Sequence, residues 1–225
     1  MPNTDTWVVV PVYNEETVIA DVIAGLGERF PNVVCVDDGS KDESAARIAT
    51  THAHLVKHPI NLGQGASLQT GIDYALRRGA RFVVTFDADG QHSVSDAERM
   101  LEVARSGEAD VVLGSRFLES TEQVPGLKRL VLRVVVALSP STRKLGLTDA
   151  HNGLRVLSRQ VAENMRISMN GMAHASEIVD ALARSPWRVR EVPVTILYTD
   201  YSRAKGQSLL NGVNILFDLS VRGQR

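Results

Sequence analysis

Short apolar runs alternate along the first half of the chain with longer segments that have the pattern of helices. The runs predict strands over Trp7–Val12, Val33–Asp37, His54–Lys57, Phe82–Phe86 and Asp110–Leu113. The segments between them predict helices over residues 16–29, 43–50, 66–78 and 95–106. This alternation is typical of a parallel sheet covered by helices. We therefore predict an α/β fold with a doubly wound N-terminal half.

The second half opens with a basic amphipathic segment, because no acidic residue occurs between Gln123 and Thr148. Leucines and valines interleave there with Lys128, Arg129, Arg133, Arg143 and Lys144. Beyond it, the pattern predicts strands over Gly153–Leu157 and Trp187–Leu197, a helix over Ala175–Arg184 and a final apolar stretch over Leu209–Val221.

Composition and charge narrow the functional classes. The 225 residues are 44% hydrophobic and 23% charged, as in an ordinary folded domain. Their net charge of −1 argues against a nucleic-acid-binding surface, which needs clustered positive charge. The N-terminus lacks the pattern of a signal peptide, and no window reaches the roughly 18 to 20 apolar residues that cross a bilayer. We therefore expect a cytoplasmic protein without a membrane span; its single Cys35 excludes an intrachain disulfide.

Polar residues follow the first two predicted strands, in Pro11-Val-Tyr-Asn-Glu-Glu16 and Val36-Asp-Asp-Gly-Ser40. Ligands of open α/β sheets bind at this carboxyl edge. An aspartate there can accept hydrogen bonds from a nucleobase, and a tyrosine can stack on the nucleobase ring. The alternative interpretation is that Asn14 and Asp38 only cap helices or turns.

Two carboxylates follow the fourth strand, in Asp87-Ala-Asp-Gly-Gln-His92. Such a pair can share a hard divalent cation, which in turn holds the two phosphates of a nucleoside diphosphate. An ordinary Asp-rich turn is the alternative. The glycine turn Asn61–Ala66 has Leu68 where the third glycine of a dinucleotide fingerprint belongs, and the chain has no P-loop, so a dehydrogenase or P-loop ATPase is disfavoured.

Five motifs together resemble the family 2 glycosyltransferases, in order and in spacing. They are Pro11–Glu15, Val36–Ser40, Asn61–Gly65, Asp87–Gln91 and Gly114-Ser-Arg116. Within the family, the chain is most similar to the dolichyl- or polyprenyl-phosphate sugar synthases, and the similarity extends through Asp149–Arg155 and Glu191–Val194. The resemblance implies a single GT-A domain over residues 1–225, with a mostly parallel central sheet flanked by helices. Residues 1–120 would bind the nucleotide-sugar, and residues 121–225 would bind the acceptor.

The resemblance also assigns roles to single residues. The nucleoside of a UDP- or GDP-sugar would contact Pro11, Tyr13, Glu15, Val36 and Asp38. Mg²⁺ or Mn²⁺ and the diphosphate would be held by Asp87, Ala88, Asp89 and Gln91. Arg116 would face the donor phosphates or the acceptor, and Arg203 and Lys205 would neutralise diphosphate charge, unless they lie in a solvated loop. Asp89, Arg116 and Asp149 are the candidate catalytic residues.

The implied reaction is direct displacement at the anomeric carbon with inversion. A lipid phosphate acceptor is already anionic and needs no general base, whereas a sugar hydroxyl needs one, with Asp149 or His151 as the first candidates. The basic amphipathic segment favours a lipid phosphate, and the candidate acceptor-binding residues are Arg129, Arg133 and Arg155. Alternatively, the segment is a helix packed on the domain with its charges in water.

Further expectations concern location and rival functions. A protein without its own span would act at the inner face of the cytoplasmic membrane, by peripheral contact or through a separate anchor protein docked on Leu209–Val221. A sugar-1-phosphate nucleotidyltransferase is one alternative, although a glycine-rich basic loop after the first strand is missing. A non-catalytic nucleotide-sugar-binding subunit is another. The remaining histidines are interpreted as surface or helix-end residues: His52, His54, His58 and His174.

Overall fold

A computed structural model describes residues 3–118, 139–149, 152–170 and 173–197. Its strands are β1 (Thr6–Val12), β2 (Asn32–Asp37), β3 (His54–Lys57), β4 (Phe82–Thr85), β5 (Val111–Ser115), β6 (Arg155–Ser158) and β7 (Val189–Pro193). Its helices are α1 (Ile19–Gly27), α2 (Ser44–Ala49), α3 (Gln64–Arg77), α4 (Val94–Arg105), α6 (Pro140–Leu145), α7 (Arg159–Asn164) and α8 (Ala173–Ala183).

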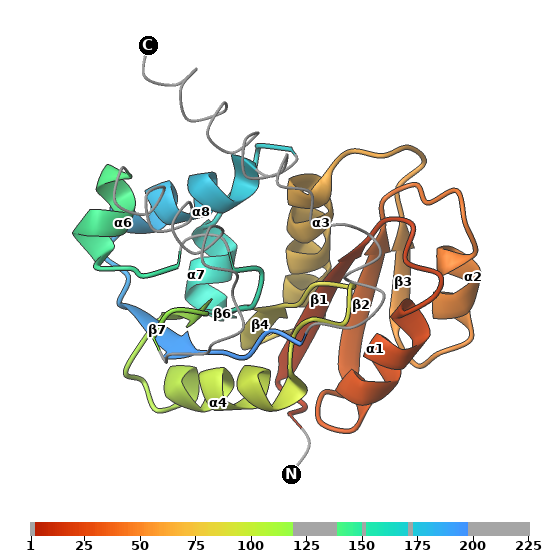
Figure 1. Ribbon diagram of the computed structural model, residues 1–225, viewed down its shortest axis with the longest axis horizontal. Helices are drawn as coiled ribbons and strands as arrows, with labels where there is room; N and C mark the ends of the chain where they lie inside the picture. The colour runs from red at the N-terminus through yellow and green to blue at the C-terminus, as the bar shows by residue number, and fades with distance from the viewer. Residues whose placement is uncertain (1–2, 119–138, 150–151, 171–172, 198–225) are drawn as a thin grey trace.

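The strands form one sheet in the order β3-β2-β1-β4-β6-β5-β7 (Figure 1). Strand β6 is antiparallel to both of its neighbours, and the other pairs are parallel. The expected mostly parallel sheet is confirmed. The reversed direction of β6 was not predicted, nor was the short helix α7. The last predicted strand is shorter than Trp187–Leu197, because the regular pairing of β7 with β5 stops at Pro193.

Two hydrophobic clusters cover the two faces of the sheet. One face packs against α1, α2 and α4, through residues such as Ile23, Ile48 and Met100. The other packs against α3, α7 and α8, and Figure 1 shows these helices on the opposite side of the sheet from α1 and α4. Neighbouring residues of β1 point alternately into the two clusters, as Val8 and Val9 do. Burial on both faces explains why the central strands are continuous apolar runs rather than alternating ones.

Strand direction decides which loops meet. Strands β1, β2, β4 and β5 run parallel, so their carboxyl ends share one edge of the sheet. Because β6 runs the other way, it begins at that edge, where Arg155 pairs with Thr85 of β4 and Leu113 of β5. The loops after four strands and the segment before β6 are thereby gathered at one place.

Among the residues that the structure describes, no helix is long and apolar enough to span a membrane.

Helix glycines give a test of how α3 packs on the sheet. A Cβ on Gly71 of α3 would lie 2.2 Å from Cγ1 of Val9 in β1. We predict that Gly71→Ala lowers the free energy of unfolding by about 1 to 3 kcal/mol, because overpacking outweighs the better helix propensity of alanine. A Cβ on Gly25 of α1 would meet no atom within 4 Å, so Gly25→Ala is expected to raise stability by up to about 1 kcal/mol. Urea titration of both variants measures the two changes in the free energy of unfolding, which should have opposite signs. A Gly71→Ala protein that is more stable than the wild type would contradict this packing.

Candidate active site

The loops after β1 and β2 are joined by hydrogen bonds at the carboxyl edge of the sheet. The backbone N–H of Asn14 donates to Ser40 Oγ (3.0 Å), and the N–H of Lys41 donates to Asn14 Oδ1 (2.9 Å). The N–H of Glu15 donates to Ser44 Oγ (2.7 Å). Asn14 has a left-handed backbone (φ 55°), which asparagine tolerates better than most residues. The two loops therefore form one unit that presents Tyr13, with 41% of its surface exposed.

Asp38 is buried and organises the next turn. Its Oδ1 accepts hydrogen bonds from the Leu62 N–H (2.9 Å) and is 2.8 Å from His58 Nδ1, and its Oδ2 accepts from the Gly63 N–H (2.8 Å). Burial alone would raise the pKa of Asp38, but the hydrogen bonds outweigh it and the pKa lies below its ordinary value. Asp38 is thus an ionised carboxylate that shapes the loop after β3.

The interpretation of the histidines as surface or helix-end residues is wrong for His58. Its side chain is 9% exposed and bridges Asp38 to Thr70 Oγ1, which lies 3.0 Å from Nε2. His174 does lie in the first turn of α8, but it is buried rather than exposed. The burial of His58 carries no local sequence signal, since its partners come from the end of β2 and from α3.

The predicted nucleoside-binding residues differ in exposure. Tyr13 and Glu15 lie at the edge of the sheet with part of their surface exposed, and Pro11 lies near the end of β1. The side chain of Val36 is fully buried in a core cluster, and so is that of Ala88, which was predicted to hold the metal and diphosphate and is 5% exposed. In this structure the latter two side chains pack in the core.

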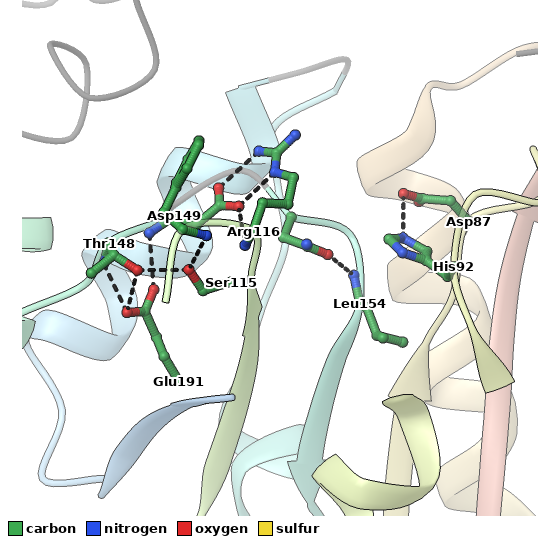
Figure 2. A network of polar contacts seen from close by, with 10 residues as sticks. Asp87, His92, Ser115, Arg116, Thr148, Asp149, Leu154 and Glu191 are labelled. Carbon is green, nitrogen blue, oxygen red and sulfur yellow. Dashed lines mark hydrogen bonds and ion pairs between the residues drawn. The ribbon is translucent and has the colours of Figure 1, made fainter. Parts of the chain in front are cut away.

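Asp87 lies directly beyond β4, in contact with three other segments. Its Oδ2 is 3.0 Å from His92 Nε2, and its Oδ1 accepts from Gln64 Nε2 at the start of α3 (3.1 Å). Burial raises the pKa of Asp87, but the hydrogen bond and charge of His92 and the charge of Arg155 outweigh this, so the net pKa is lowered. The carboxylate is therefore ionised and fixed in orientation (Figure 2).

Gly153 allows the segment before β6 to approach this carboxylate. A Cβ at position 153 would lie 2.1 Å from Asp87 Oδ2, so no larger residue fits without displacement of Asp87. The hydroxyl of Thr85 donates to the Gly153 carbonyl (2.6 Å) and holds this contact. Two residues later, Arg155 is buried, and burial lowers its pKa although the charges of Asp87 and Asp149 oppose this.

Asp89 is held less firmly than Asp87. Its Oδ1 accepts from the Gln91 N–H (3.0 Å). Burial and the neighbouring charge of Asp87 raise the pKa of Asp89, with a further contribution from Glu15. Two neighbouring carboxylates, one of them with a raised pKa, fit a hard divalent cation, which takes oxygen ligands. In the part of the chain that the structure describes, no group of three or more His, Cys, Asp and Glu side chains could hold a metal ion. Mg²⁺ is commonly held by one or two carboxylates together with substrate phosphates, so the pair suits a cation that binds with a diphosphate.

Unsatisfied polar atoms concentrate at the same place. Within the described ranges, the buried side-chain N and O atoms without a hydrogen-bond partner are His92 Nδ1, Asn152 Nδ2 and Arg155 Nη1. All three belong to residues that contact Asp87 or lie within two positions of Gly153. Buried polar groups are normally paired, and a cluster of exceptions calls for a missing partner such as water, an ion or a ligand. The polar environment of Asp87 is therefore incomplete in the protein alone.

Arg116, just beyond β5, forms a bidentate pair with Asp149. Its Nε donates to Asp149 Oδ2 (2.6 Å) and its Nη2 donates to Oδ1 (2.8 Å). The Arg116 side chain is 16% exposed and that of Asp149 is 1% exposed. Figure 2 shows this pair on the side of Leu154 opposite to Asp87, with Glu191 of β7 below it. The structure thus brings together two of the three predicted catalytic residues at the ends of neighbouring loops.

Several predicted site residues cannot be placed. Arg129, Arg133, Arg203, Lys205 and His151 lie outside the described residues, as does the stretch Leu209–Val221. The described chain does reach the proposed metal loop before residue 198. The Leu197 N–H donates to the Gln91 carbonyl (2.9 Å), and Ile196 forms an isolated antiparallel bridge with His92.

Sequence reasoning missed four residues that complete the site. These are His58, Gln64, Gly153 and Glu191, which accepts a hydrogen bond from the Asp149 N–H. Gly153 and Glu191 lie within motifs that the sequence analysis quoted, but their roles arise only when β6 and β7 take their places in the sheet. Gln64 lies in the glycine turn Asn61–Gly65, one of the five motifs on which the family resemblance rests.

Known proteins with a similar sequence match this chain over nearly its whole length. Residues 7–166 match the family described as Glycosyl transferase family 2. The UDP-N-acetylglucosamine–dolichyl-phosphate N-acetylglucosaminyltransferase of Methanococcus voltae is 29% identical over 239 residues, which cover 95% of this chain and 94% of that protein. The polyprenol monophosphomannose synthase of Mycolicibacterium smegmatis is 30% identical over 227 residues, with 95% and 84% covered.

Solved structures agree on the architecture. The glucosyl-3-phosphoglycerate synthase of Mycobacterium tuberculosis, crystallised with Mn²⁺ and UDP-glucose, superposes with a TM-score of 0.69 at 19% identity, over 93% of this chain and 79% of that chain. This similarity confirms the GT-A fold. Since the family match extends over more than half of the chain, the protein belongs to glycosyl transferase family 2 and is a glycosyltransferase.

Proposed function

We propose that this protein transfers a hexose, with inversion, from a nucleoside-diphosphate sugar to a polyprenyl-type lipid phosphate. The observation that carries the proposal is the state of Asp149, whose two carboxylate oxygens both accept hydrogen bonds from Arg116. A general base must reach the acceptor hydroxyl, but the Asp149 side chain is only 1% exposed and turned onto Arg116. An acceptor that is already anionic needs no such base, and it is attracted by an arginine at the site.

The donor would lie along the carboxyl edge from β2 to β4. In this proposal Tyr13 and Glu15 contact the nucleoside, and Asp38 contributes through the loop that it holds. Residues 1–120 bind the donor and residues 121–225 bind the acceptor. Ligands of open α/β sheets bind where such loops converge.

Asp89 and Asp87 would hold a divalent cation, with Gln91 as a further contact. When bound, the cation supplies positive charge that stabilises the departing nucleoside diphosphate. The chain itself prepares the site, because His92 and Gln64 fix Asp87 from two sides while Asp89 is held less firmly. Arg203 and Lys205 would add positive charge around the diphosphate.

The acceptor phosphate would be bound by Arg116, with Arg129, Arg133 and Arg155 as further cations. The two relatives described above support this choice, because their names specify dolichyl phosphate and polyprenol monophosphomannose. A basic amphipathic segment over residues 123–148 suits the interface where a lipid phosphate is found. Peripheral membrane contact, or a separate anchor protein, follows from this acceptor.

A product assay tests the proposal. The purified protein is incubated with UDP- and GDP-sugars, Mg²⁺ or Mn²⁺, and a polyprenyl phosphate, and both the lipid-linked sugar and the released nucleotide are measured. We expect nucleoside diphosphate and glycosylated lipid phosphate in equal amounts. Release of pyrophosphate would indicate nucleotidyl transfer instead, and turnover only with a sugar hydroxyl acceptor would overturn the proposed acceptor.

The metal assignment predicts a strong effect of Asp89. Asp89→Ala should reduce transfer by at least about 100-fold, because charge on the leaving diphosphate loses its main stabilisation. The matched control is Asp21→Asn, which removes an exposed carboxylate in the first turn of α1. Initial rates over a Mn²⁺ titration measure both variants. Metal-dependent turnover by Asp89→Ala near the wild-type rate would contradict the assignment.

The pairing of Arg116 with Asp149 predicts strong non-additivity. If Asp149 acts by orienting Arg116, the Arg116→Ala and Asp149→Ala changes remove the same contribution, and the double variant should be no slower than the slower single variant. Kinetic constants of the four proteins with a lipid phosphate acceptor complete the cycle. Multiplicative losses would mean that Asp149 has an independent role, as a general base would.

A further inference from the structure

One partly buried carboxylate connects three segments of the chain that are distant in sequence. Glu191 in β7 pairs in register with Leu113 of β5, two residues before Ser115. Its carboxylate accepts hydrogen bonds from the segment Thr148–Asp149, and that segment contacts Ser115 and Arg116 (Figure 2). The motifs at residues 114–116, 149–155 and 191–194 thus meet at a single side chain.

The contacts of Glu191 occupy both of its oxygens. Oε1 accepts from the Asp149 N–H (2.9 Å), and Oε2 accepts from the Thr148 N–H (2.8 Å) and the Thr148 hydroxyl (2.9 Å). Two consecutive backbone amides are therefore fixed immediately before the Asp149 side chain. This contact sets where the carboxylate of Asp149 lies.

The charge of Glu191 also sets the direction of a hydroxyl chain. An ionised carboxylate can only accept, so the Thr148 hydroxyl donates to it. The Thr148 oxygen then accepts from the Ser115 hydroxyl at 2.6 Å. Ser115 Oγ in turn accepts from the Phe117 N–H (3.1 Å), the amide that follows Arg116.

Arg116 is consequently held from two sides by contacts that lead back to Glu191. Its guanidinium and its backbone N–H both donate to Asp149, the latter at 3.2 Å from Oδ2. The next amide is held through Ser115. We propose that Glu191 is a positioning residue, which fixes the orientation of Arg116 by holding the Thr148–Asp149 segment.

The environment of Glu191 fits a functional role better than a stabilising one. Burial and the charge of Asp149 raise the pKa of Glu191, although the hydrogen bonds from Thr148 and Asp149 offset part of the effect. An ionised carboxylate with a raised pKa lowers the stability of the fold at neutral pH. Perturbed pKa values of this kind are typical of functional sites.

Two pairs of variants test this inference. Glu191→Gln keeps the size of the side chain but turns one acceptor into a donor that faces N–H groups. Its control is Glu108→Gln, which removes an exposed carboxylate that pairs with Arg190 of the same strand as Glu191 (2.6 Å). Thr148→Ser keeps the hydroxyl that links Ser115 to Glu191, and Thr148→Val removes it.

The kinetic readouts separate positioning from general destabilisation. We expect Glu191→Gln to lower kcat/KM for the lipid phosphate by about 10- to 100-fold, as misplacement of a binding group does. The Kd of the metal–nucleoside diphosphate complex should stay at its wild-type value. Thr148→Val should lower kcat/KM for the lipid phosphate by a smaller factor. Thr148→Ser, which keeps the hydroxyl, and Glu108→Gln should both have the wild-type kcat/KM.

A spectroscopic readout keeps the test independent of the assay. The inference rests on the proposed function, because it assigns Arg116 to a substrate phosphate. The ¹⁵N–¹H signal of Arg116 Nε, identified with Arg116→Lys, should be protected from hydrogen exchange in the wild type and lose protection in Glu191→Gln. If the wild type transfers no sugar to lipid phosphate but this change is seen, the proposed function fails and the positioning role stands.

Two outcomes would overturn the positioning role. One is wild-type kinetics and unchanged Arg116 exchange in Glu191→Gln. The other is a parallel loss of diphosphate binding, transfer and thermal stability, which would mean that Glu191 supports the fold as a whole. If Glu191→Gln does not fold, equal activities of Thr148→Val and Thr148→Ser would overturn it.

Discussion

The antiparallel strand β6, inserted between β4 and β5, is the constraint on which the site depends. Because it begins at the edge where its neighbours end, it delivers the segment before it to that edge. Gly153 can then pack against Asp87, with a distance of 2.1 Å between Asp87 Oδ2 and the position of an added Cβ. Asp149, which also precedes β6, lies at this edge and pairs with Arg116. A parallel strand in this place would carry these residues to the opposite edge of the sheet.

Some of the charged side chains at this edge are paired within the protein, and others lack a partner of opposite charge among the residues that the structure describes. Asp149 is fully engaged by Arg116, and Asp87 is held by His92 and Gln64. Asp89 retains a raised pKa, and Arg155 is a buried cation whose Nη1 finds no partner in the described part of the chain. Buried charge without a partner costs stability, so such groups are typical of sites that a ligand completes. A cation bound with a diphosphate would satisfy Asp89, and an anionic substrate group would satisfy Arg155.

Much of this arrangement was predictable from local patterns, and the remainder depends on distant contacts. Apolar runs and glycine turns located β1, β2, β4 and β5, and therefore the edge at which Tyr13, Asp38 and Asp87 gather. The direction of β6 was not predictable, because a strand of only four residues has no sequence pattern that distinguishes one direction from the other. The role of His58 was missed for a related reason: its partners Asp38 and Thr70 come from the end of β2 and from α3, on either side of it in sequence. The contacts of Glu191 with Thr148 and Asp149 could be seen only in the structure, where β7 lies beside β5.

The central proposal is that the carboxyl edge of the sheet binds a metal–diphosphate complex at the Asp87–Asp89 loop and leaves Arg116 for the acceptor phosphate. The most direct measurement is a crystal structure of the protein with Mn²⁺ and UDP or GDP, in which anomalous scattering locates the metal. The account predicts an anomalous peak that is coordinated by Asp89 and by diphosphate oxygens, with Arg116 still paired to Asp149. A nucleotide bound elsewhere, or a diphosphate held at this edge without metal density near Asp89, would contradict it.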